Sequence, residues 1–156
     1  MLLAIYLNDH LAGSTAGTEL AKRAAGSNRG SDYGQFLDEL ARELAEDRQS
    51  LIEIMRALGV GVDRLKMLGA WGAEKAGRLK PNGRLFEYSP LSRVVELEGL
   101  ALGINGKLAL WRALDRLSPG HPELANFDLA ALAARAESQL ERVEPHRLRA
   151  VAEALA

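Results

Sequence analysis

The feature that most constrains this chain is the helical spacing of its apolar residues, which is interrupted only at short stretches rich in glycine or proline. Leu and Ala supply 28 and 25 of the 156 residues, and both are strong helix formers. Apolar side chains recur at intervals of three and four residues, the period of one helix face. β-Branched residues, which favour strands, are sparse. The pattern predicts an all-α protein with a single domain over residues 1–156.

Four long helices and one shorter helix are predicted from these periodic stretches. Their expected bounds are 2–25, 32–58, 63–79, 90–117 and, for the last helix, Asn126 or Asp128 to Leu155. Each long helix would measure about 36 to 43 Å. The simplest packing is an up-down four-helix bundle of the long helices, with the short helix 63–79 in a crossover, as in ferritin-like folds. The alternative is a single core to which all five helices contribute.

Local signals support several of the predicted boundaries. Asp32 followed by Gln35 resembles a capping box at the start of the second helix. Ser89 before Pro90 predicts an N-cap with proline at the first helical position. Pro145 lies inside the last helix and is expected to kink or split it.

Composition and charge exclude several functional classes. The formal net charge is −1, which argues against a nucleic-acid-binding protein. The absence of cysteine excludes a disulfide scaffold, a thiolate metal site and a cysteine nucleophile. No apolar stretch is long enough to span a membrane. We therefore expect a soluble, cytoplasmic protein, and the high content of Ala, Gly and Arg suggests a bacterial source.

A few polar residues interrupt the predicted inward faces of the helices. His10, Asp47 and Glu98 each take a position where an apolar side chain is expected, and Glu43 lies one turn before Asp47. In a four-helix bundle, sites for metals and cofactors are built from such facing side chains. Carboxylates and imidazole can bind iron, manganese or zinc. One hypothesis is therefore a metal site at these four residues, and a second is a small-molecule pocket.

The alternative to a binding site is a set of buried ion pairs. Asp47 and Arg48 would then pair with charges on neighbouring helices, and Glu98 with an arginine such as Arg48 or Arg112. His10 would be hydrogen-bonded to Glu98 or to a backbone carbonyl. The ion-pair interpretation requires no ligand and is therefore simpler than either binding hypothesis.

Glycine occurs at helical spacing inside two of the long helices, as Gly13 with Gly17 and Gly99 with Gly103. Each glycine costs about 1 kcal/mol relative to alanine in a helix. Close helix–helix contact would compensate for this cost, and a ligand slot beside the glycines is the second explanation. In the short helix, Trp71 lies on a second apolar face, which suggests either that this helix is covered on both sides or that it makes a dimer contact.

The segment Tyr6-Leu-Asn-Asp-His-Leu-Ala-Gly-Ser14 resembles one found in uncharacterised bacterial ferritin-like proteins. The resemblance implies a four-helix bundle and no particular activity. Di-iron members of the wider superfamily carry Glu-x-x-His motifs, whereas here Glu43 is followed three residues later by Glu46, and Glu98 by Ala101. The resemblance therefore supplies a fold and no catalytic residue.

Two functional hypotheses remain open from the sequence. The first is a non-enzymatic binding or interaction protein that forms a homodimer. The second is a bundle that binds a divalent metal or a small molecule around His10, Asp47 and Glu98. The sequence leaves open whether the protein is an enzyme.

Overall fold

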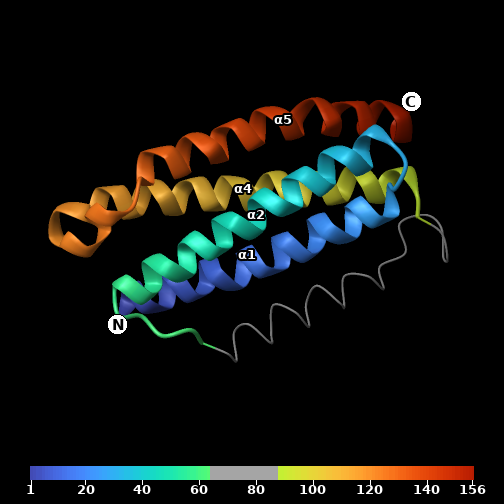
Figure 1. The fold of residues 1–156 in the computed structure, drawn as a ribbon. Coiled ribbons are helices and arrows are strands. Elements are labelled where there is room, and N and C mark those ends of the chain that lie inside the picture. Colours follow the sequence, from blue (N-terminus) through green and yellow to red (C-terminus); the bar gives the residue numbers. More distant parts are fainter. Residues whose placement is uncertain (64–87) are drawn as a thin grey trace.

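The computed structural model describes residues 1–63 and 88–156, and four long helices make up most of this part (Figure 1). They are α1 (Leu2–Ser27), α2 (Asp32–Ala57), α4 (Pro90–Leu117) and α5 (Leu129–Leu155). Two short 3₁₀ helices, η1 (Ser118–Gly120) and η2 (Pro122–Asn126), connect α4 to α5. No strand occurs in either described range, which confirms the all-α prediction.

The short helix predicted at 63–79 falls, from residue 64 onward, outside the described residues. Its place in a crossover or in a five-helix core therefore stays a prediction. The same holds for the dimer contact expected at Trp71.

The predicted ends of the four long helices are confirmed to within two residues, with Asp128 rather than Asn126 as the N-cap of α5, but two details differ. The N-cap of α2 is Ser31, whose hydroxyl accepts a hydrogen bond from the Gly34 N–H, so the capping box expected at Asp32 is wrong. α5 continues through Pro145 without a break, so this proline does not split the helix. As predicted, the Ser89 hydroxyl caps α4 by accepting a hydrogen bond from the Ser92 N–H.

The helices form two antiparallel hairpins, α1 with α2 and α4 with α5, and α1 also packs against α4 (Figure 1). α2 and α4 run in the same direction, since Arg93 near the start of α4 lies over the Tyr33 ring near the start of α2, and Lys107 farther along α4 contacts Asp47. The end of α2 and the start of α4 therefore lie at opposite ends of the bundle.

Buried leucines on all four helices form one continuous core, which includes Leu7, Leu37, Leu40, Leu97 and Leu100. Trp111 is the largest side chain among those with less than 2% exposure. Because the core runs the length of the bundle, polar side chains that enter it need partners there.

The inward face of α4 differs from the prediction. Glu98 was expected to lie inside, but it faces solvent, as do Val95 and Leu102, of which Leu102 is 74% exposed. The buried face consists instead of Leu97, Leu100 and neighbouring residues. α4 carries apolar residues around most of its circumference, so its periodicity alone does not select one face.

A polar cluster holds the start of α4 against the turn between α1 and α2. The buried Asn28 side chain donates to the Tyr88 hydroxyl over 2.8 Å and accepts from Arg93 Nε over 2.7 Å. Tyr88 in turn donates to Glu96, over 2.8 Å. At the same turn, a Cβ on Gly34 would lie only 2.4 Å from the Asn28 carbonyl oxygen, so this close approach requires glycine.

Candidate functional site

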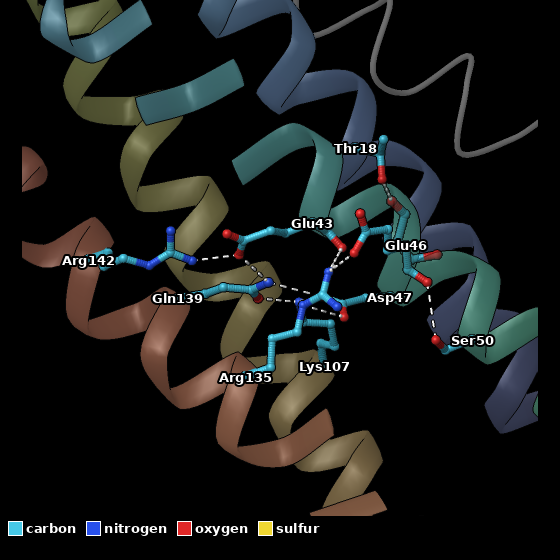
Figure 2. A network of polar contacts seen from close by, with 10 residues as sticks. Thr18, Glu43, Glu46, Asp47, Ser50, Lys107, Arg135, Gln139 and Arg142 are labelled. Atoms are coloured by element: carbon cyan, nitrogen blue, oxygen red, sulfur yellow. Dashed lines mark hydrogen bonds and ion pairs between the residues drawn. The ribbon is translucent and has the colours of Figure 1, made fainter. Parts of the chain in front are cut away.

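Three helices meet at a buried polar triad formed by Asp47 of α2, Lys107 of α4 and Gln139 of α5 (Figure 2). Lys107 donates to both the Asp47 carboxylate and the Gln139 amide oxygen. Gln139 Nε2 lies 3.1 Å from Asp47 Oδ2, and it also donates to Glu43 over 3.0 Å. Asp47 is 2% exposed and Gln139 is fully buried. The triad therefore supplies donors to Asp47 Oδ2, as a buried charge requires, whereas Asp47 Oδ1 accepts no hydrogen bond from the described residues.

Two arginines of α5, Arg135 and Arg142, lie beside the triad (Figure 2). Arg142 donates to Glu43 over 2.5 Å, and Arg135 Nε lies 3.3 Å from Asp47 Oδ1. Burial lowers the pKa of Lys107, while the Asp47 charge opposes this shift. Every group of the triad thus engages another protein group, which makes it a structural cross-link between three helices rather than an open reactive centre.

A cavity of about 270 Å³ lies next to the triad, between α1, α2 and α4. Much of its wall is apolar, with Leu44, Leu51, Leu100 and Ile104 among the lining residues. Exposed residues such as Gly103 also line it, so the cavity reaches the surface of the molecule.

Glycines provide part of the space in this cavity. Gly13, Gly17 and Gly103 line it, and a Cβ on any of them would meet no described atom beyond the local helix backbone within 4 Å. Close helix contact therefore does not explain these three glycines. Gly99 is different, because a Cβ there would lie 3.2 Å from Leu20 Cδ2. Of the two explanations from the sequence, helix contact fits Gly99, and open space beside the helix fits the other three.

The rings of Trp111 and His10 line the cavity, and their N–H groups have no hydrogen-bond partner among the described residues. Trp111 is 1% exposed, and its Nε1–H donates to no described atom. Such a buried donor costs about 1 to 3 kcal/mol if it remains unpaired. His10 packs edge-on against Tyr6, with ring centroids 4.5 Å apart, and its ring nitrogens make no hydrogen bond to a described residue. Burial lowers the pKa of His10, opposed by the charge of Asp9.

The structure brings together only some of the four residues predicted as a site. Asp47 is buried as expected, and Glu43 adjoins it through Gln139. His10 and Asp47 both line the cavity. Glu98 does not belong to this group, because its side chain is half exposed and lies 3.6 Å from Arg147 of α5. Neither predicted partner pairs with Glu98 among the described residues. Arg112 pairs with Glu137 instead, and Arg48 forms no ion pair there.

A metal centre gains no support from this geometry. Within residues 1–63 and 88–156, no group of three or more His, Asp or Glu side chains is arranged to hold a metal ion. The hydrogen bonds expected for His10, to Glu98 or to a backbone carbonyl, are likewise not formed in the described part of the chain.

Sequence reasoning missed Lys107 and Gln139, although they form two of the three corners of the triad. Gln139 follows Leu132 and Ala136 at helical spacing, which places it on the same face of α5 and is consistent with its complete burial. Lys107 follows Gly106 in a stretch whose inward face was wrongly assigned. Because the buried face of α4 was predicted incorrectly, nothing in the sequence indicated that the Lys107 side chain is buried.

Comparisons with protein-family models, curated proteins and solved structures found no match to this chain. None of the described helices combines the length and the apolar character that crossing a membrane would require. The functional conclusion therefore depends on the cavity and the residues around it.

Proposed function

We propose that this protein is a non-enzymatic binding protein that holds a small, mainly apolar molecule in the cavity between α1, α2 and α4. The observation that carries the proposal is an apolar cavity of about 270 Å³ whose lining includes the buried Trp111 Nε1–H, a donor without a partner among the described residues. Ligand sites are typically concave and apolar, with a few polar groups that orient the ligand. A hydrogen-bond acceptor on the ligand would satisfy the Trp111 donor.

The size of the cavity limits the ligand. An engineered apolar cavity of about 150 Å³ is sufficient to bind benzene. A volume of 270 Å³ therefore suits a molecule larger than benzene and smaller than most drug-sized ligands, which occupy roughly 300 to 1,000 Å³. An aliphatic molecule of about eight carbons falls within this range, which makes 1-octanol a suitable neutral test ligand.

The polar triad supports this function by fixing the wall of the cavity. Asp47 and Lys107 line the cavity and are held by Gln139 on the far side. Because these contacts join α2, α4 and α5, they keep two of the three helices that surround the cavity in register. We assign the triad a structural role and no catalytic step.

A ferritin-like arrangement is part of the same proposal. It is supported by the direction of the helices, in which α2 and α4 are parallel and each pairs with an antiparallel neighbour. Such an order requires one connection between opposite ends of the bundle, which is the arrangement of ferritin-like folds.

Trp111 provides a direct assay for the proposed function. In a Trp71→Phe variant, Trp111 is the only tryptophan, so its fluorescence reports on the cavity. Titration with 1-octanol should change the emission in a saturable way and raise the melting temperature, because a ligand that binds only the folded state stabilises it.

The control for this titration uses two glycines on α4. Gly103→Leu places a side chain in the cavity and should abolish the response, whereas Gly106→Leu changes a residue outside the lining and should preserve it. The absence of any saturable response, or its equal loss in both variants, would refute the proposal.

A further inference from the structure

Arg48 of α2 lines the cavity and carries a positive charge that no carboxylate neutralises within the described structure. Its Nε donates to the Thr15 hydroxyl over 2.9 Å, and no other hydrogen bond or ion pair of its guanidinium occurs there. A guanidinium has five N–H donors arranged in a planar fork, which matches both oxygens of a carboxylate. Within residues 1–63 and 88–156, Arg48 therefore has donors left over for an anionic ligand.

The other charged groups that line the cavity are already engaged. Lys107 and Asp47 pair with each other, and Asp47 also lies near Arg135. Asp9 is exposed and has an interaction partner. The charge left to be balanced is therefore the positive charge of Arg48, which favours an anionic ligand over a cationic one.

The Trp111 Nε1–H, which has no partner among the described residues, lies near Arg48 along the bundle. Asp47 and Lys107 are in contact and mark the same level of the parallel helices α2 and α4. Arg48 follows Asp47 directly, and Trp111 lies one turn beyond Lys107, which is about 6 Å along the helix axis. Both groups could therefore contact one polar head group.

The cavity is also elongated. Its lining on α4 extends from Leu100 to Trp111, which is roughly 16 Å at 1.5 Å per residue. Only about 270 Å³ is distributed along this length, so the space is narrow. An unbranched chain fits such a slot better than a compact ring system.

From these observations we infer that the ligand is a monocarboxylic acid with an unbranched apolar chain, whose carboxylate binds Arg48. The chain extends along the apolar wall formed by residues such as Leu100 and Ile104. This inference rests on the proposed function and adds the chemical class of the ligand.

The test compares three ligands of equal chain length, octanoate, 1-octanol and octylamine, in the Trp111 fluorescence titration at neutral pH. Octanoate should bind about tenfold more tightly than 1-octanol, because a charge-assisted bidentate contact is stronger than a neutral one, and octylamine should bind most weakly. Arg48→Gln should lower the affinity for octanoate about tenfold and leave that for 1-octanol unchanged. Arg42→Gln, at an exposed position on the same helix outside the cavity, should change neither affinity.

The outcomes separate this inference from the proposed function. If 1-octanol binds saturably but octanoate has no advantage, or Arg48→Gln leaves the octanoate affinity intact, the carboxylate assignment is overturned and the binding function remains. If neither ligand binds, the proposed function itself fails. Unchanged binding of 1-octanol shows that the cavity of the Arg48→Gln variant is still folded.

Discussion

Replacing Gly103 by alanine should raise the free energy of unfolding and lower the affinity for the ligand, and these two effects can be measured separately. Glycine in a helix interior costs about 1 kcal/mol relative to alanine. A Cβ at this position would meet no described atom beyond the local helix backbone within 4 Å, so no clash offsets the gain. Gly103→Ala should therefore stabilise the protein by about 1 kcal/mol, which corresponds to roughly 2 to 4 °C in melting temperature for a chain of this size.

The same methyl group should weaken ligand binding, because Gly103 lines the cavity. If it displaces about one methylene of the ligand, the loss is about 0.8 kcal/mol, or roughly a fourfold lower affinity. Gly106→Ala is the matched control, since this residue is also in α4 with open space beside it but does not line the cavity. It should give the stability gain alone.

Two assays measure these effects separately. Guanidinium unfolding gives the change in the free energy of unfolding, and titration of the Trp71→Phe background with 1-octanol gives the affinity. A loss of stability in Gly103→Ala would refute the conclusion that space is open at this position. Equal affinities in Gly103→Ala and Gly106→Ala would refute the conclusion that the ligand occupies the space beside Gly103.

Three further predictions concern stability. Gly34→Ala should destabilise the protein by about 1 to 3 kcal/mol in guanidinium unfolding, because the new Cβ would lie 2.4 Å from the Asn28 carbonyl oxygen; a neutral effect would contradict this close approach. Asp47→Ala should cost about 3 to 5 kcal/mol by leaving a buried ammonium without its carboxylate, whereas Glu137→Ala, in an exposed ion pair, should cost under about 1 kcal/mol; similar losses would show that the triad is not a buried cross-link. Burial lowers the pKa of His10 below its ordinary 6.5, so the imidazole is protonated at a higher pH in the unfolded chain than in the folded protein, and the free energy of unfolding falls between pH 7 and pH 5. His10→Asn should reduce this fall, and an unchanged pH dependence would show that burial of the imidazole does not contribute to it.

The helices were predictable because their signals are local. Capping at Ser89 and the three-to-four spacing of leucines act within a few residues, and both are found where expected. The burial of Asp47 was also predictable, since this residue interrupts a regular apolar face on α2. On α5, by contrast, the helix continues through Pro145, so this local helix-breaking signal did not predict where the helix ends.

The sequence by itself determined the number of long helices, their approximate ends and the inward position of Asp47. Only the tertiary structure decided which face of α4 is buried, because apolar residues occur around most of that helix and its neighbours select among them. It also decided the partners of Asp47, since Lys107 lies 60 residues away and Gln139 another 32 residues beyond it. The cavity arises in the same way, because the space beside Gly17 and Gly103 exists only where α1, α2 and α4 come together.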